Sequence, residues 1–242
     1  MLKVLQQQQQ IDAARSELRR CGASAMDPWP LAWRWGRKLG LLSGMAVGDR
    51  VKSWDVLQSL QFLESALPRD AAILDIGAFA SEMPVALHRR GFTRVAAVDL
   101  NPSLGNMPAA GAIDYRVSDF MATPFSDGTF AAVTSVSVIE HGYQPERLLG
   151  EVSRLLQPGG YFLASFDYWP DKIDTRDTRF FGMDWLIFSA DDVRDLIGQA
   201  AAYGLEPVGE LQTAADAAVI HCGGKDYTFA WLVLRKGAAV CA

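Results

Sequence analysis

The amino-acid sequence predicts an α/β domain, in which helices cover both faces of a mostly parallel sheet. Two observations favour this fold class. After Arg50, short β-forming runs alternate with amphipathic helix-forming runs, which is typical of strand–helix–strand units. Near the end of the sequence the pattern changes, because two strand-like runs flank a stretch that holds Gly223 and Gly224. This arrangement favours an antiparallel pair as the last part of the sheet.

The elements follow in chain order. Strands are expected over residues 71–76, 94–98, 113–117, 129–136, 161–166, 205–211 and 227–235. Helices are expected over residues 52–67, 81–90, 145–156 and 190–203. Pro68 ends the first helix because proline cannot continue it, and Gly91 and Gly204 suit the left-handed residue that follows a helix. Right-handed crossovers then place helices on both faces of the sheet.

Residues 1–50 are expected to form an N-terminal helical and irregular extension, and residues 51–242 the main domain. Residues 2–20 have a helix-forming composition with a loose apolar stripe. They form either a helical or frayed extension or a helix that pairs two copies of the chain into a homodimer. The following segment carries Trp29, Trp33 and Trp35, and it either packs as a surface loop or covers a pocket.

Composition narrows the class of protein. The formal net charge is -5, and an acidic surface repels phosphate backbones, so no nucleic-acid partner is expected. Cys21, Cys222 and Cys241 are widely spaced, which suits a reducing cytoplasm. Three histidines are too few for a dedicated zinc site, so no metal is expected. The first residues are too polar for a signal peptide, and no apolar run reaches the roughly 18–20 residues of a membrane span. A cytoplasmic location is therefore expected.

Polar groups follow three successive strands. Asp75 and Gly77 follow the first strand, Asp99 the second, and Asp119 with Phe120 the third. Open α/β sheets bind ligands at the carboxyl ends of their strands. Glycine lets the backbone approach a ligand, and the carboxylate of Asp75 suits a cationic group such as an ammonium. Asp99 can accept from ribose hydroxyls, Asp119 can accept from an exocyclic amine, and Phe120 can pack on an adenine ring. Together they predict a site for an adenosine bearing an amino acid.

These motifs carry a resemblance to a known family. The run ILDIGAFASEMP, VAAVDLNP, YRVSDFMATPFSDGTFAAVTSVSVIEHG and EVSRLLQPGGYFLASF, within residues 71–166, resembles the class I S-adenosylmethionine (SAM)-dependent methyltransferases, near the methyltransferase type 11 group. The tail extends the resemblance to about residue 236. The resemblance implies a Rossmann-like seven-stranded sheet of order 3-2-1-4-5-7-6 with strand 7 antiparallel. It also implies an enzyme that uses S-adenosyl-L-methionine, with residues 51–242 as the methyltransferase domain.

The resemblance implies cofactor contacts at the matching positions. The methionine part of SAM would be held by Asp75, Gly77 and the backbone of Ala78 and Phe79. Asp99 would hold the ribose, and the adenine would meet Leu100, Asp119 and Phe120. The backbone near the sulfonium would come from Ser135 and Val136. The sequence departs from the family at one motif. The family's GxGxG loop is here Gly77-Ala78-Phe79-Ala80-Ser81, so Phe79 and Ser81 replace the second and third glycines. This change either reshapes the pocket or weakens SAM binding, and the intact later motifs favour reshaping.

His141 and Asp167 are the candidate catalytic residues. His141 follows the fourth strand, and it is either a general base for the acceptor or a residue that shapes the cofactor pocket. Asp167 follows the fifth strand, and it binds the acceptor, acts as the base, or belongs to a loop packed on the core. Trp169 could stack on a sugar. Lys52 either borders the cofactor or is a solvated lysine, and residues 171–179 form a charged, solvated loop where substrate lids often lie.

The acceptor is expected to be a small molecule or a sugar, methylated on oxygen. The expectation of a sugar acceptor rests on four segments, KSWDV, VSVIEHG, DYW and DYTFAWLVLRK. They look similar to segments of bacterial methyltransferases that act on sugars or cell-surface glycans. Two other functions compete. An NAD(P)-binding oxidoreductase suits Asp99, but the first turn lacks GxGxxG and Asp75 would oppose a pyrophosphate. A non-catalytic methyltransferase-like binding protein is favoured only by the altered glycine loop.

Overall fold

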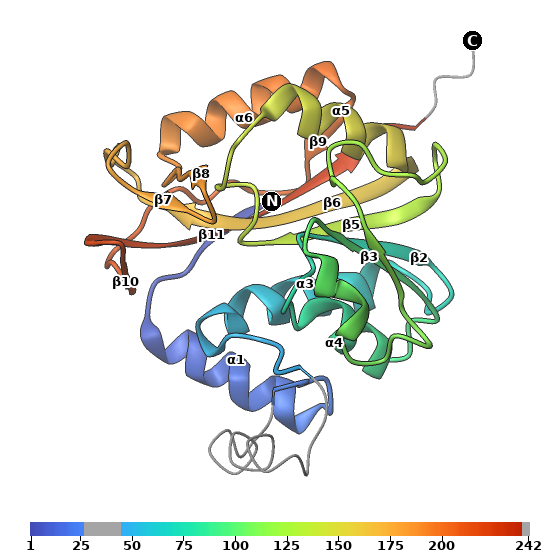
Figure 1. Ribbon diagram of the computed structural model, residues 1–242. Helices are drawn as coiled ribbons and strands as arrows, with labels where there is room; N and C mark the ends of the chain where they lie inside the picture. Colours follow the sequence, from blue (N-terminus) through green and yellow to red (C-terminus); the bar gives the residue numbers. More distant parts are fainter. Residues whose placement is uncertain (27–44, 239–242) are drawn as a thin grey trace.

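The computed structural model describes residues 1–26 and 45–238, which form three layers with a large sheet in the middle (Figure 1). Helices α1 (Gln8–Arg20), α3 (Ser53–Ala66) and α4 (Met83–Arg89) lie on one face of the sheet. Helices α5 (Pro145–Leu155) and α6 (Ala190–Ala202) cover the other face. Each face has its own apolar core. The expected α/β fold class with helices on both faces is confirmed. The segment with Trp29, Trp33 and Trp35 lies outside the described residues.

Parallel strands form the centre of the sheet. They are β2 (Ala72–Ile76), β3 (Arg94–Asp99), β4 (Asp114–Val117), β5 (Phe130–Val136) and β6 (Leu156–Tyr168). All residues of β2 are buried, as expected of a parallel strand covered on both faces. The path runs β6-β5-β2-β3-β4, so the chain first moves from β2 to one side and then returns to the other. Loops leaving β2 and β5 therefore diverge and open a crevice at their carboxyl ends.

The strand β11 (Lys225–Lys236) pairs antiparallel with β6 and completes the sheet. Its other edge is shared by three short strands: β10 (Ile220–Cys222), β1 (Leu2–Val4) and β9 (Leu205–Pro207). Gly223 and Gly224 both have positive φ, 57° and 71°, and they close the two-residue hairpin between β10 and β11. The sheet thus has nine strands within the described residues rather than the expected seven, because β1 and β10 add to it.

The N-terminal segment begins with a strand where a helix was expected. Leu2 and Val4 are buried, and β1 pairs with residues Ala230–Leu232, so these first residues gain backbone hydrogen bonds in the sheet that an exposed helix turn would lack. The helix α1 starts only at Gln8. Its stripe of Ile11, Ala14 and Leu18 is buried and packs toward α3 of the same chain. Among the helices that the structure describes, none has the length and apolar character needed to cross a membrane.

Four further strands differ from expectation. β6 runs through residues 157–160, where a break was expected, and these residues form an irregularity in its pairing with β5, between the pairs Phe130–Leu156 and Ala132–Tyr161. β9 ends at Pro207, four residues early, because proline has no N–H to donate. The short pair β7 (Arg179–Phe180) and β8 (Met183–Asp184) was not expected, as two-residue strands leave no periodic signal.

Candidate active site

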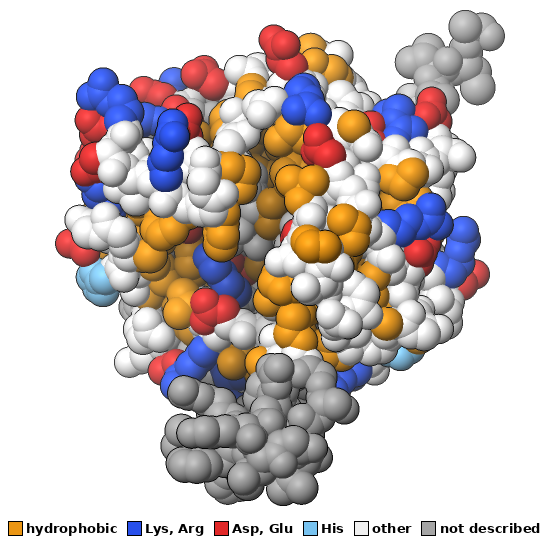
Figure 2. All heavy atoms as spheres, in the orientation of Figure 1, with side chains coloured by type: hydrophobic (Ala, Val, Ile, Leu, Met, Phe, Trp, Pro, Cys, Tyr) orange, Lys and Arg blue, Asp and Glu red, His pale blue; other side chains and the backbone are white. Residues whose placement is uncertain are grey.

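A cavity of about 740 Å³ opens at the carboxyl ends of β2, β3 and β5. This volume falls in the range of about 300–1,000 Å³ that is usual for small-molecule sites. Figure 2 shows a hollow on this face, where hydrophobic side chains gather around a few charged ones. The strand ends contribute Gly77, Phe79–Glu82, Asp99–Asn101, Phe120, Val136–Val138 and His141 to its walls. Segments outside the central strands add Gly48, Asp49, Lys52, Val56, Phe181 and Met183.

Gly77 sets the shape of the loop after β2. Its φ is +69°, and a Cβ at this position would lie 2.4–2.5 Å from the two methyl groups of Val138. Only glycine therefore lets this loop pass so close to the chain that follows β5. Ala78 is buried and donates its N–H to Val98 O at 3.0 Å. Ala80, at φ +61°, takes the second left-handed position without a glycine.

Asp99 is fixed at the cavity wall by two backbone donors. Its Oδ2 accepts from the N–H of Phe79 at 3.0 Å, and its Oδ1 accepts from Asn101 at 2.8 Å. The next side chain, Leu100, is 62% exposed although apolar, and it lines the cavity together with Phe120. A carboxylate flanked by two apolar surfaces matches a ribose with its attached adenine.

Asp119 is placed differently from its neighbours. Its Oδ2 forms an ion pair with Arg147 at 2.9 Å, and its Oδ1 accepts from the Met121 N–H at 2.8 Å. It is half-exposed and does not line the cavity, whereas Phe120 does. Both carboxylate oxygens keep a free lone pair, so they can still accept a hydrogen bond from an amine.

Buried polar atoms without partners lie beneath the loop after β2, residues 77–81, which is called the cofactor loop because the resemblance to methyltransferases places SAM there. Asp75 is 1% exposed, and Thr134 Oγ1 donates to its Oδ1 at 2.6 Å. Asp75 Oδ2 and the hydroxyl of Ser135 find no hydrogen-bond partner among the described residues. Burial raises the pKa of Asp75 to about 7. Because unpaired buried acceptors are costly, Asp75 Oδ2 fits a site that receives a donor such as an ammonium.

His141 is half-buried at the cavity wall between aromatic rings. Its ring lies 6.0 Å from that of Phe180 and 5.4 Å from that of Phe181, both edge-on. Burial lowers the pKa of His141 to about 4, with a smaller contribution from the positive charge of Lys52. The imidazole is therefore neutral at physiological pH. Within the described part of the chain, its Nδ1 has no hydrogen-bond partner.

Lys52 reaches the cavity and separates it from Asp167. The ammonium donates to Ser137 Oγ, stands 3.9 Å over the ring of Phe229, and lies 4.0 Å from Asp167 Oδ1. Asp167 is 4% exposed and accepts from Trp185 Nε1 at 2.7 Å, so it lies behind Lys52 and does not line the cavity.

Two more buried carboxyls, Asp55 and Glu140, belong to this cluster. Burial raises the pKa of Asp55 to about 7, and it raises the pKa of Glu140 and Asp167 as well. The negative charges of Asp167 and Asp55 raise the pKa of Glu140 further. Lys52 opposes these shifts, so one ammonium compensates several acidic groups at the base of the cavity.

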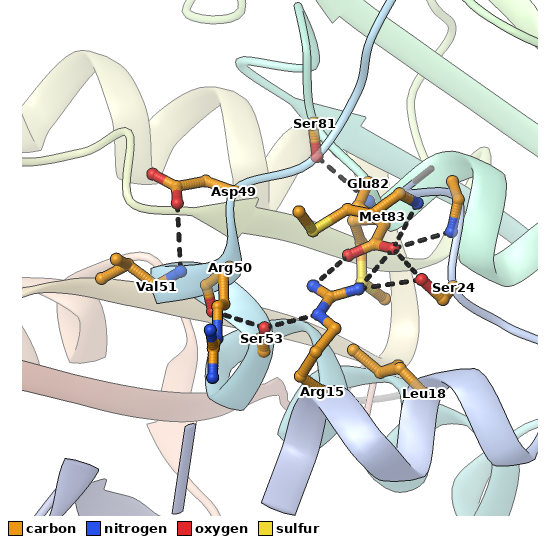
Figure 3. Close-up of polar contacts among 12 residues, drawn as sticks. Arg15, Leu18, Ser24, Asp49, Arg50, Val51, Ser53, Ser81, Glu82 and Met83 are labelled. Atoms are coloured by element: carbon orange, nitrogen blue, oxygen red, sulfur yellow. Dashed lines mark hydrogen bonds and ion pairs between the residues drawn. The ribbon is translucent and has the colours of Figure 1, made fainter. Parts of the chain in front are cut away.

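A buried ion pair ties the N-terminal segment to the cofactor loop (Figure 3). Arg15 of α1 and Glu82, directly after the loop, are 3% and 2% exposed and are joined at 2.6 Å and 2.9 Å. Glu82 also accepts from the N–H groups of Ala25 and Met26. Burial alone would raise the pKa of Glu82, but these bonds and the charge of Arg15 hold it below its ordinary value. Ser53 accepts from Arg15 Nε at 2.9 Å, so four segments meet here.

The structure brings together most of the residues expected from sequence. Asp99, Gly77, Phe79, Leu100, Phe120, Val136 and His141 line one cavity, while Asp75, Ala78 and Ser135 lie just below it. Asp119 and Asp167 do not line the cavity. Trp169 packs against the core. The sequence reasoning missed Glu82, Ser137, Phe181 and Met183. Phe181 and Met183 lie on a hairpin whose strands are too short to show a periodic pattern in the sequence. Glu82 was missed because its ion-pair partner, Arg15, is far away in the sequence.

The described residues show no group of three or more His, Cys, Asp and Glu side chains arranged to hold a metal ion. The orphaned acceptor of Asp75, the glycine that allows close approach, and the Asp99 carboxylate between apolar surfaces together fit SAM.

Comparisons with known proteins agree with this fit. A family model described as a methyltransferase domain matches residues 74–164. The chain is 32% identical over 110 residues to a ubiquinone biosynthesis O-methyltransferase of Xanthomonas oryzae pv. oryzae. The matched segment covers 41% of this chain and 45% of that protein. The chain thus spans less than half the length of this curated relative.

Two solved structures share the fold. The [4+2]-cyclase SpnF has a TM-score of 0.61 at 15% identity, with 98% of this chain and 99% of that chain covered. The geranyl diphosphate C-methyltransferase of Streptomyces coelicolor A3(2), solved with S-adenosyl-L-homocysteine (SAH), has a TM-score of 0.59 at 17% identity, with 92% and 97% covered. The matched motifs, the fold and the cavity agree: residues 74–164 match a methyltransferase domain, the chain has the fold of SAM-dependent methyltransferases, and its site fits S-adenosyl-L-methionine as the cofactor.

Proposed function

We propose that this chain transfers a methyl group from SAM to an oxygen atom of a small-molecule acceptor. The observation that carries the proposal is one shared cavity, which is lined by the cofactor loop, by Asp99 and by His141. The ubiquinone biosynthesis relative, which is named an O-methyltransferase, supports oxygen as the acceptor atom. The domain spans residues 51–242 in this proposal, and residues 1–50 form an extension, from which Arg15, Ala25 and Met26 bind Glu82 next to the cofactor loop.

Each part of the cofactor has a set of contacts in this proposal. The methionine ammonium meets Asp75, beside Gly77 and the backbone of Ala78 and Phe79. Asp99 accepts from the ribose, Leu100 and Phe120 pack on the adenine, and Asp119 accepts from its amine. The backbone of Ser135 and Val136 borders the sulfonium.

His141 accepts the proton of the acceptor hydroxyl. The bound cofactor supplies a methyl group activated by a positively charged sulfur, so the chain must orient the acceptor and remove one proton. The low pKa of His141 keeps the imidazole neutral and able to accept. This weak base suffices because the proton of an oxygen that is forming a new bond becomes strongly acidic. Asp167 is a positioning residue here, since it lies behind the Lys52 ammonium rather than at the wall.

The first test is calorimetric titration of the purified chain with SAM and with SAH. We expect binding of both, and a loss of affinity of about tenfold or more in Asp99→Ala, because a charged hydrogen-bond partner is removed. Asp114→Ala is the matched control, since Asp114 is an exposed acid on β4 whose one ion-pair partner among the described residues is Arg116. Absence of binding by the wild type would reject the proposal.

The second test is SAH formation from SAM with phenols, aliphatic alcohols and methyl glycosides as acceptors. We expect turnover of at least one hydroxyl compound and its loss in His141→Asn, with SAH affinity retained. Methylation of carbon or nitrogen compounds alone would contradict oxygen as the acceptor atom. Retained turnover in His141→Asn would leave His141 as a residue that shapes the pocket.

A further inference from the structure

The hairpin β7–β8 places an aromatic side chain at the mouth of the cavity. Phe180 pairs with Met183, so Phe181 and Gly182 form a two-residue turn. Both turn residues have positive φ, 56° and 78°, which is the pattern of a type I′ turn. The first position of such a turn favours Asn, Asp or Gly, and a bulky side chain with positive φ is strained. The backbone conformation at residue 181 therefore disfavours phenylalanine.

The fold gains little from this phenylalanine. Phe181 is 84% exposed, the most exposed of the large hydrophobic side chains in the described residues. An exposed ring contributes little burial of apolar surface, so folding explains neither the residue type nor its conformation. Strained residues that the fold does not need are most often found where a ligand binds.

The hairpin is held firmly next to His141. The N–H of Gly142 donates to Asp184 O at 2.8 Å, and the N–H of Leu186 donates to Glu140 O at 2.9 Å. The ring of Phe180 packs edge-on against Trp185 at 5.0 Å. These contacts fix the turn so that the Phe181 ring stands 5.4 Å from the His141 ring and lines the cavity with Met183.

We propose that Phe181 is a specificity-determining residue that selects an apolar aromatic alcohol as the acceptor. The ring of the acceptor packs against Phe181 and Met183, and its hydroxyl faces His141. Val136 and Val138 extend the apolar wall on the side of β5. Aromatic rings pack favourably edge-on or offset, so the acceptor ring gives Phe181 a second partner beside the His141 ring and covers part of its exposed surface. A sugar would leave its hydroxyls against these apolar groups, where they find no partner. This inference rests on the proposed methyl transfer to oxygen.

The test combines a stability measurement with a binding measurement on Phe181→Asn. Asparagine suits the left-handed position, so the melting temperature of the variant should rise by a few degrees. The affinity of the SAH-loaded protein for 1-naphthol, measured by calorimetry, should fall roughly fivefold or more because an aromatic contact is lost. Affinity for SAH should stay unchanged. Phe181→Trp keeps the ring and should retain 1-naphthol binding.

Ala109→Asn is the matched control. Ala109 is also exposed with φ +61°, but it does not line the cavity. Its replacement should raise the melting temperature without changing 1-naphthol binding. The inference is overturned if the wild type binds methyl glucoside rather than 1-naphthol, if Phe181→Asn keeps full affinity, or if that variant is destabilised. Binding of 1-naphthol that depends on Phe181 without methylation of any hydroxyl compound would instead reject the proposed function alone.

Discussion

At Gly77, the absence of a side chain determines the path of the cofactor loop. Two constraints act on the same residue: the left-handed φ of +69° and the contact with Val138. The first disfavours every L-residue with a side chain, and the second leaves no space for even a methyl group. The neighbouring Ala80 shows that the first constraint alone can be met by alanine. The contact with Val138 is therefore what makes glycine necessary at residue 77.

Replacing Gly77 by alanine should weaken SAH binding by about tenfold or more, because the loop must move away from β5 or strain by roughly 1–2 kcal/mol. Calorimetry with SAH measures the effect. Gly105→Ala is the control, since no atom lies within 4 Å of the added Cβ and its φ is not positive. The additional change Val138→Ala should restore part of the affinity. Unchanged affinity in Gly77→Ala would mean that this loop does not approach the cofactor.

The sequence predicted single residues best where a strand ends. Asp99 and His141 line the cavity because the carboxyl ends of neighbouring parallel strands must meet at one edge of the sheet, and that follows from topology. Asp167 was also expected at this edge, yet it lies behind Lys52. Whether a side chain at a strand end faces the cavity or the core depends on its packing partners, here Trp185 and Lys52, and these come from distant parts of the sequence.

At the scale of elements, α1 is attached to the cofactor loop by one buried ion pair. Its two partners lie 67 positions apart in the sequence, so no local pattern could have revealed them. The apolar stripe of the helix was visible in the sequence, whereas its partner helix was not. The strands and helices of the central sheet were predicted to within a few residues, because their periodicity is local. β1, β7, β8 and β10 are short strands that depend on a neighbour, and they were missed.

Breaking this ion pair should be costly. Arg15→Met leaves Glu82 buried without its counter-charge, and we expect a loss of about 3–5 kcal/mol in the free energy of unfolding. Affinity for SAH should fall as well, because Glu82 follows the cofactor loop and lines the cavity. Denaturant unfolding and calorimetry below the melting temperature measure the two effects.

An exposed ion pair between neighbouring elements provides the control. Arg50, just before α3, pairs with Asp12 of α1 at the surface, and Arg50→Met should change stability by less than about 1 kcal/mol. The double variant Arg15→Met with Glu82→Gln should recover part of the lost stability, since no unpaired charge remains. Full SAH affinity in a folded Arg15→Met protein would show that the ion pair serves stability alone.

At the scale of the whole molecule, buried acids make stability depend on pH. The pKa values of Asp55 and Asp75 rise from 3.8 to about 7 on folding, because burial disfavours the charged form. Each group therefore contributes stability that is fully present below about pH 4 and is lost as the pH rises through 7. His141 acts in the opposite direction, since its pKa falls from 6.5 to about 4, and its contribution is lost as the pH falls through that range.

Asp55→Asn isolates one of these contributions. At pH 3.5 its free energy of unfolding should be close to that of the wild type, because Asp55 is then largely neutral in both the folded and the unfolded chain. At pH 8 the variant should be more stable by a few kcal/mol, since each unit of pKa shift corresponds to about 1.4 kcal/mol. Denaturant titrations at both pH values give the comparison, in which the effect of His141 cancels. A variant that is less stable than the wild type at pH 8 would show that the charged form of Asp55 is favoured by Lys52 after all.

The position of β1 has a consequence for how the chain reaches its fold. Residues 2–4 pair with residues 230–232, so β1 has no place in the sheet until the last long strand has left the ribosome. Arg15 meets its partner much earlier, once residue 82 has been made. Contacts between such distant residues form late, because a long loop must close first. Synthesis thus separates the two attachments of the N-terminal segment, whereas refolding from denaturant offers both at once. A nascent chain and a refolding chain should therefore arrive at the same sheet by different routes.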